Sequence, residues 1–137
     1  MQATVTWLDG RAFVGESGSG HAVVMDGAPD AGGRNIGIRP MEMLLIGVGG
    51  CSAFDVVSIL EKARQKVTGC RVELQAERAD AIPAVFTKIH LQFKVSGTDL
   101  NVQQVERAVK LSADKYCSAS IMLRGAGVEV THGFEIV

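Results

Sequence analysis

Residues 40–51 read PMEMLLIGVGGC, and this stretch decides the fold. Pro40 fits the first turn of a helix, where its missing N–H costs nothing. The apolar spacing then stays helical from Met41 to about Lys66, which predicts a long central helix. Cys51 lies inside this helix, and a second cysteine, Cys117, closes another helical pattern later in the chain. Two thiols that lie close together are the minimum requirement for two-electron redox chemistry at sulfur.

Three glycines precede Cys51 closely, at positions 47, 49 and 50. Each glycine destabilises a helix interior by roughly 1 kcal/mol relative to alanine. We expect another backbone, packed closely against this face of the helix, to compensate. The glycines also keep side chains away from the thiol, which packing alone rarely requires.

Alternation of apolar and polar residues predicts strands on both sides of the helix. Ala3, Val5 and Trp7 indicate a first strand with one buried face, and Asp9-Gly10 predicts a hairpin turn after it. Residues 26–39 are rich in glycine and predict a loop. Further strands are expected at residues 11–16, 21–25, 70–77, 87–95 and 128–136. A helix is expected from the capping residue Asn101 to Tyr116, followed by a short helical or irregular piece. This order predicts one α+β domain over residues 1–137, without βαβ units.

The composition excludes several classes of function. With 137 residues, 47% hydrophobic and 21% charged, the chain can bury a core and is not typical of disorder. A net charge of −1, with acids and bases interspersed, gives no basic surface for nucleic acid or an anionic membrane. The longest uncharged run in the helix, Met43 to Phe54, is about 12 residues, which we take as too short to span a bilayer. Without a signal peptide, the cytoplasm is the expected location, and the thiols there are reduced.

The three cysteines are not equivalent. Cys70 shares the apolar register of its strand and is expected to be an inert core residue. Cys51 has Asp55 one helix turn further on, and a cation that meets this carboxylate would also favour a thiolate. Arg11 is a candidate for that cation, although a solvated hairpin arginine is an equally good interpretation. Cys117 is expected at a helix C-terminus, where the dipole disfavours a thiolate, so we predict that Cys51 attacks and Cys117 resolves.

Other motifs carry little chemistry. No cysteine or histidine spacing suggests zinc, and His90 and His132 are expected to be surface, core or rim residues rather than ligands. The glycine-rich segments match neither a dinucleotide fingerprint nor a phosphate loop. Ser52 and Ser58 have no base near them in sequence and are expected to be packing residues. We therefore predict neither a metal nor a bound cofactor.

The chain resembles the OsmC/Ohr family, the osmotically induced and organic hydroperoxide resistance proteins, and in particular its YhfA-like branch. The segments that carry the resemblance extend over nearly the whole chain, and the paired cysteines are its most specific feature. They are Gly10-Arg11, Gly15-Glu16-Ser17-Gly18, Pro40 to Leu45, Gly49-Gly50-Cys51, Asp55 to Leu60 and Tyr116 to Ser120.

The resemblance implies an OsmC-like fold, with two helices packed on antiparallel sheets and two chains intertwined as a homodimer. It also implies a peroxidase. A Cys51 thiolate would attack the O–O bond of an organic hydroperoxide and become a sulfenic acid, and Cys117 would resolve it as a disulfide. A dithiol such as a lipoyl group would then restore the enzyme, as in a stress response. Arg11 matches the arginine of the family.

The chain departs from the hydroperoxide-reducing pattern in two places. The family places a glutamate directly after the proline to hold the arginine, whereas here Met41 follows Pro40 and Glu42 comes next. Because nine residues at roughly 100° each put Glu42 opposite Cys51, Asp55 is the better candidate to orient Arg11. The family also places a proline after the second cysteine, where this chain has a serine.

Two alternatives remain open at this point. The first is a non-catalytic member that binds an apolar small molecule at the dimer interface, or a redox sensor. The second is a purely structural oligomer, which leaves the helix glycines less well explained. We expect Met43, Leu44, Phe54 and Met122 to give the substrate pocket an apolar lining. Such a lining favours an apolar organic hydroperoxide over hydrogen peroxide.

Overall fold

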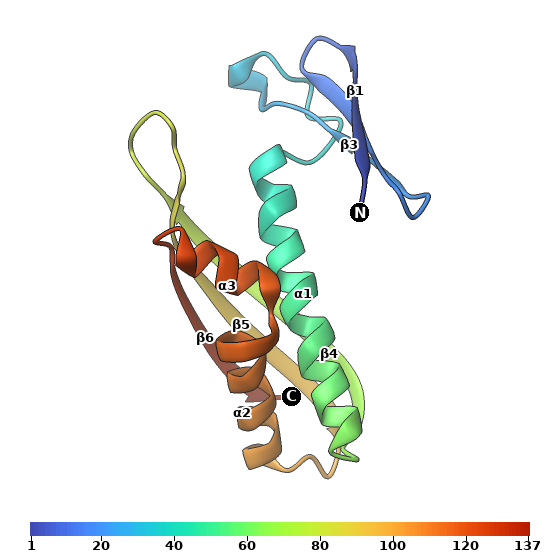
Figure 1. Cartoon of the computed structure of the whole chain (residues 1–137), viewed down its shortest axis with the longest axis vertical. Coiled ribbons are helices and arrows are strands. Elements are labelled where there is room, and N and C mark those ends of the chain that lie inside the picture. Colours follow the sequence, from blue (N-terminus) through green and yellow to red (C-terminus); the bar gives the residue numbers. More distant parts are fainter. The chain divides into compact units, whose positions relative to one another are not determined.

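The computed structural model describes all residues from 1 to 137, and the chain forms two compact units. One unit comprises residues 1–44 and the other residues 45–137, and helix α1 continues from the first into the second. The elements of each unit can be followed along the chain in Figure 1. The prediction that residues 1–137 form one domain stays a prediction.

The N-terminal unit contains an antiparallel sheet in the order β1-β2-β3. Its strands are β1 (Ala3–Asp9), β2 (Ala12–Ser17) and β3 (Ala22–Met25). The predicted turn is present, and Gly10 has a φ of 53° there, a conformation that glycine adopts readily. The expectation that one face of the first strand is buried is wrong for this chain, because all of β1 is exposed. Val5 and Trp7 keep 61% and 63% of their surface accessible.

One buried carboxylate organises the loop after β3. Asp26 is only 2% exposed, and its carboxylate accepts hydrogen bonds from the backbone N–H groups of Gly27, Arg34 and Ile36 at 2.8, 2.9 and 3.3 Å. These bonds lower the pKa of Asp26, the bond from Arg34 most of all, because they favour the charged form. A short 3-10 turn, η1 (Pro29–Ala31), lies within the segment that Asp26 closes.

Helix α1 (Pro40–Lys62) confirms the predicted central helix and ends about one turn earlier than expected. Its start is capped in both directions. The Arg39 backbone N–H donates to a Glu42 carboxylate oxygen at 2.9 Å, and the Arg39 carbonyl accepts from the Met43 N–H at 3.0 Å. The cysteine-bearing helix is therefore held in place at its first turn by Glu42.

The glycines of α1 face different surroundings. A Cβ on Gly49 would lie 2.7 Å from Leu74 Cδ1, so the helix approaches the sheet closely at this point. A Cβ on Gly47 or Gly50 would meet nothing within 4 Å. The neighbour at Gly49 is a side chain, so the expectation of another backbone packed closely against these glycines is wrong within the chain.

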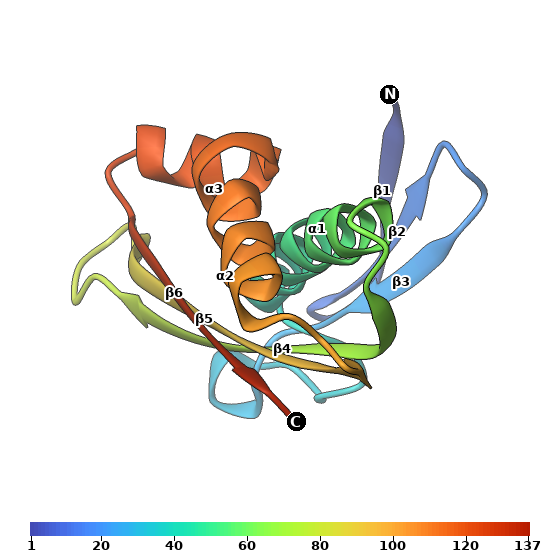
Figure 2. The same cartoon turned by 90° about the horizontal axis from the view of Figure 1, so that it is seen from below.

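The C-terminal unit contains a second sheet, in the order β4-β5-β6. Its strands are β4 (Lys66–Arg78), β5 (Phe86–Thr98) and β6 (Glu129–Ile136). The helices of this unit cover one face of the sheet, as Figure 2 shows. The alternation predicted for β5 is confirmed, since its apolar residues Ile89, Leu91, Phe93 and Val95 are all buried beneath the helices.

The α+β class is confirmed, but two details of the prediction are wrong. Strand β6 pairs in parallel with β5, so these two strands and the helices between them form a βαβ unit, which the prediction excluded, and the sheet is not purely antiparallel. The helix expected to run to Tyr116 is also interrupted. Regular helix α2 (Val102–Leu111) is followed by a π-helical segment, η2 (Ser112–Tyr116), and after Cys117 a new helix begins, α3 (Ser118–Gly125).

The length of α1 also corrects an expectation. With 23 residues and a mean hydropathy of 2.0 in its most apolar window, it is long and apolar enough to cross a membrane. The prediction that the helix is too short to cross a bilayer rested on its uncharged run alone. A membrane-spanning helix can also contain one or two charged residues. This is weak evidence for a membrane, because the core helix of a soluble protein passes the same test. Here the helix packs Val48, Val56 and Leu60 into the core.

Candidate functional site

The structure brings Cys51, Asp55 and Cys117 together within the C-terminal unit. The two Sγ atoms and a carboxylate oxygen of Asp55 all lie within 4.8 Å of one another. Cys51 and Asp55 project from adjacent turns of α1, and Cys117 comes from the junction between η2 and α3. All three cysteines are free thiols in this structure. The site is therefore a reduced thiol pair with a carboxylate beside it.

Cys117 is completely buried and accepts hydrogen bonds at its sulfur from two serines. Ser52 Oγ donates at 3.1 Å, Ser120 Oγ at 3.2 Å and the Ser120 backbone N–H at 3.4 Å. Burial alone raises the pKa of Cys117, but these hydrogen bonds, with a further one from Cys51, outweigh it. The pKa of Cys117 therefore lies below its ordinary value.

This arrangement overturns the helix-polarity argument for the two cysteines. Cys117 follows the end of η2, as its C-cap, but it is also the N-cap of α3. Its sulfur accepts a hydrogen bond from the Ser120 N–H in the first turn of α3. The positive end of a helix dipole favours a thiolate, whereas the predicted C-terminus would disfavour it. The error arose because the π-helical segment before Cys117 continues the apolar spacing of α2 and hides the new helix start.

Cys51 has the opposite character. It is half-buried, and burial is the largest cause that raises its pKa. A hydrogen bond from the Ala119 backbone opposes this effect. The hydrogen bond with Cys117 and the negative charges of Cys117 and Asp55 raise the pKa of Cys51 further. The pKa of Cys51 therefore lies above its ordinary value, whereas that of Cys117 lies below.

Asp55 interacts with a serine rather than with a cation of its own unit. Ser112 Oγ donates to an Asp55 carboxylate oxygen at 3.4 Å and to the Ser52 carbonyl at 3.2 Å. Asp55 forms no salt bridge. Its charge acts on Cys51 by raising the pKa of that thiol, which is opposite in sign to the effect of an Asp55-bound cation.

The other two predicted site residues belong to the N-terminal unit. Arg11 is exposed, and its side chain lies beside Gly27 and Gly32. The Glu42 carboxylate is engaged with the Arg39 N–H at the start of α1, so it serves as a cap. The roles of Arg11 in activation and of Asp55 in its orientation stay predictions.

Sequence reasoning missed the serines that shape the site. Ser52, which we expected to be a packing residue, is 2% exposed and donates to the Cys117 sulfur. Ser112 and Ser120 are also buried. Buried hydroxyls require partners, but only the tertiary structure shows that these serines are buried, so no signal in the sequence identified them. Cys70, which was expected in the core, is only half-buried, and this burial raises its pKa.

A hollow of about 480 Å³ lies beside the site and shares Asp55 with it. Its apolar wall includes Phe54, Ile59, Leu111 and Tyr116, and Lys62 and Arg107 add positive charge. Of the residues predicted to line an apolar pocket, Phe54 is therefore in place. Leu44 and Met122 are largely exposed, and Met43 lines a different hollow, against β1, β2 and β3.

Comparison with known proteins identifies the family. The family model for OsmC-like proteins matches residues 32–133. The chain belongs to the OsmC-like family. It is 52% identical over 137 residues to the protein YhfA of Escherichia coli K12, with 100% of this chain and 98% of that protein covered.

Solved structures of OsmC-like proteins share the fold. An OsmC-like protein from Mycoplasma pneumoniae superimposes with a TM-score of 0.85 at 13% identity, over 99% of this chain and 96% of that one. The organic hydroperoxide resistance protein OhrB of Bacillus subtilis gives a TM-score of 0.65 at 22% identity, over 98% of both chains. The predicted OsmC-like fold is thereby confirmed.

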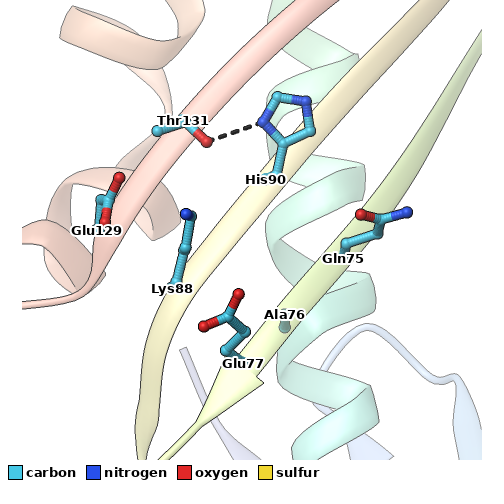
Figure 3. Close-up of a pocket in the computed structure, with 7 residues that line it drawn as sticks. All are labelled: Gln75, Ala76, Glu77, Lys88, His90, Glu129 and Thr131. Atoms are coloured by element: carbon cyan, nitrogen blue, oxygen red, sulfur yellow. Dashed lines mark hydrogen bonds between the residues drawn. The ribbon is translucent and has the colours of Figure 1, made fainter.

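This OsmC-like chain also carries a hollow on the outer face of its second sheet, away from the helices. Figure 3 shows the residues that line it, with Lys88 between Glu77 and Glu129, and the His90 ring bonded to Thr131 Oγ1 at 2.8 Å. Its volume is about 510 Å³. No cysteine lines this hollow, so it takes no part in the chemistry of the thiol pair.

Proposed function

We propose that this OsmC-like protein reduces organic hydroperoxides with Cys51 and Cys117. The observation that carries the proposal is the thiol pair itself, with the two sulfurs within 4.8 Å and one of them favoured as a thiolate by three donors. Family membership supports it, because fold relatives include proteins named for organic hydroperoxide resistance. The cytoplasm, where thiols are kept reduced, is the proposed location.

Access decides which sulfur attacks. Cys117 is completely buried, whereas Cys51 is partly exposed. Cys51 is therefore the sulfur that a peroxide reaches, although its pKa is the higher of the two. The Cys117 thiolate accepts the Cys51 proton as the Cys51 sulfur attacks the O–O bond. The bond breaks, Cys51 becomes a sulfenic acid, and the proton passes to the leaving alkoxide, which departs as an alcohol.

The same thiolate then completes the reaction. Freed of the proton, the Cys117 sulfur attacks the sulfur of the Cys51 sulfenic acid and displaces hydroxide, which takes a proton from solvent and leaves as water. The product is a Cys51–Cys117 disulfide, so two thiols have supplied the two electrons that the hydroperoxide accepts. An external dithiol such as a lipoyl group would restore both thiols by disulfide exchange.

The hollow beside Asp55 supports an organic substrate. The apolar side chains Phe54, Ile59 and Leu111 offer contacts to a hydrocarbon group, which hydrogen peroxide lacks. The expected preference is therefore for an organic hydroperoxide. Competition between cumene hydroperoxide and hydrogen peroxide measures it, and faster reduction of hydrogen peroxide would contradict the assignment of this hollow.

The working unit in this proposal is a homodimer. Helix α1 leaves large apolar side chains uncovered, with Leu44, Ile46 and Phe54 at 55%, 58% and 75% exposed. Strand β4, with 13 residues, is an edge strand of its sheet, and long unpaired edges are usually covered in stable proteins. A second copy that packs on α1 would bury these residues and fill the space beside Gly47 and Gly50.

The decisive experiment is mass spectrometry of the reduced protein after one equivalent of cumene hydroperoxide. We expect a loss of two hydrogens and a Cys51–Cys117 bridge within one chain. Cys51→Ser should abolish the reaction, and Cys117→Ser should stop it at the sulfenic acid, which a dimedone probe traps. Cys70→Ser is the matched control and should react as the unmodified chain does. Unreacted thiols, or oxidation that includes Cys70, would refute the proposal.

One observation favours a second function, ligand binding or redox sensing without turnover. The raised pKa of Cys51 slows its reaction at neutral pH. A sensor would form the disulfide once and show no turnover with any dithiol, whereas the proposed enzyme turns over repeatedly with reduced lipoamide. Steady-state consumption of the hydroperoxide separates the two functions.

A further inference from the structure

We propose that the reduced site is also a zinc site, in which Cys51 Sγ, Cys117 Sγ and the Asp55 carboxylate bind one Zn²⁺ ion. No zinc-binding spacing is visible in the sequence, because the ligands come from two separate segments. The proposal rests on the proposed function in one respect only, that both use the same reduced thiol pair. It adds a form of regulation that peroxide chemistry alone does not require.

The geometry fits a tetrahedral ion. Zinc binds sulfur at about 2.3 Å and carboxylate oxygen at about 2.0–2.2 Å, so two sulfurs on one ion lie about 3.8 Å apart. The three ligand atoms already lie within 4.8 Å of one another. Side-chain rotation of Cys51 and Asp55, which are neighbours at i and i+4 on α1, is enough to close the remaining distance of about 1 Å.

The donor set selects the metal. Two thiolates and one carboxylate suit zinc, whereas calcium and magnesium prefer sites made of oxygen only. Three protein ligands leave the fourth position of the tetrahedron open to water or a small thiol. The three groups also accumulate negative charge as they ionise, and a divalent cation would neutralise it.

The surrounding serines already hold the ligands as a metal site requires. Ser112 Oγ donates to the Asp55 carboxylate at 3.4 Å, and Ser52 Oγ and Ser120 Oγ donate to the Cys117 sulfur at 3.1 and 3.2 Å. Such outer hydrogen bonds orient metal ligands and typically contribute 10- to 100-fold in affinity. Two of the ligands are therefore oriented before any ion arrives.

Zinc and peroxide would compete for the same sulfurs. A zinc ion on Cys51 and Cys117 occupies the electron pairs needed for attack and for resolution, so the metal-bound site is protected. Oxidation of the unbound pair by an organic hydroperoxide forms the disulfide and leaves Asp55 as the only ligand. The oxidised protein should therefore be unable to bind Zn²⁺ again, and the dissociated ion stays in solution with its charge unchanged.

The test is a zinc titration of the reduced, metal-free full-length protein against a chromophoric chelator. We expect one equivalent of Zn²⁺ per chain. Asp55→Asn should weaken binding at least 10-fold, and Cys51→Ser or Cys117→Ser should abolish stoichiometric binding. Cys70→Ser and Glu61→Gln, an exposed carboxylate on the same helix, are matched controls and should bind as the unmodified chain does. Binding that Asp55→Asn leaves unchanged, or that Cys70→Ser abolishes, would overturn the proposal.

A second measurement needs no variant, in case a substitution prevents folding. Zinc should slow the alkylation of Cys51 and Cys117 and leave Cys70 unaffected, as mass spectrometry of the labelled peptides would show. Equal protection of all three thiols, or of none, would refute the site. Peroxide reduction is measured separately with a chelator present. A protein that reduces peroxide but binds no zinc refutes only this inference, and one that binds zinc but reduces no peroxide refutes only the proposed function.

Discussion

Ser120 donates to the Cys117 sulfur twice, through its hydroxyl at 3.2 Å and its backbone N–H at 3.4 Å. The second bond exists because Cys117 is the residue that caps α3. A fully buried thiol would ordinarily resist ionisation, but at this helix start the two donors favour its charged form. The reactivity of the pair therefore depends on where a helix begins as much as on which residues are cysteines.

Removal of the Ser120 hydroxyl should raise the pKa of Cys117. Ser120→Ala deletes one donor to the sulfur and is expected to destabilise the fold by about 0.5–1.5 kcal/mol, the usual net contribution of a hydrogen bond. The pKa is measured from thiolate ultraviolet absorbance against pH, in a Cys51→Ser, Cys70→Ser background where only one thiol remains. Ser118→Ala, an exposed neighbour, is the control. An unchanged pKa would show that the hydroxyl does not act on the sulfur.

Removal of the Asp55 charge should lower the pKa of Cys51, because that charge raises it. In Asp55→Asn, alkylation of Cys51 should therefore begin at a lower pH, as followed by peptide mass spectrometry. The predicted role for Asp55, orientation of Arg11, requires the opposite shift. A raised pKa of Cys51 in this variant would support that role. Glu61→Gln, which removes a more distant charge from the same helix, is the control.

The open glycines of α1 test the dimer. In an isolated chain, Gly47→Ala should stabilise the helix by roughly 1 kcal/mol, since a Cβ there meets nothing within 4 Å. If a second copy packs on this face, the added methyl group should instead weaken association, which light scattering during size-exclusion chromatography would show. Gly125→Ala, at another helical glycine that faces open space, is the matched control. A stabilised chain with unchanged oligomeric state would contradict the proposed interface.

Asp26 should make the N-terminal unit sensitive to acid. Its folded pKa is below the ordinary 3.8, so its stabilising effect is fully present above pH 3.8 and is lost as the pH falls through the folded value. Asp26→Asn should therefore melt at a lower temperature than the unmodified chain at pH 7. The difference should shrink as the pH falls from 3.8 through the lower folded pKa, because Asp26 then becomes neutral in the folded chain as well. Asp30→Asn, on the exposed turn η1, should show no such difference.

The strand and helix patterns were predictable because local periodicity determines which residues can share a buried face. Strand β5 shows this well, with Ile89 to Val95 alternating as expected. The central helix was predictable from Pro40 and the apolar spacing after it. The parallel pairing of β6 was not, because the direction of a strand depends on the path of the helices before it.

The candidate site was likewise predictable from the sequence only in part. The sequence alone determined that Cys51 lies inside a long helix, with Asp55 one turn away, because helical spacing fixes which side chains share a face. Only the tertiary structure decided that Cys117 caps a new helix, that Ser52 and Ser120 donate to its sulfur, and that its pKa falls while that of Cys51 rises. A pKa is set by burial and by neighbours within a few ångströms, and these neighbours come from segments far apart in the chain.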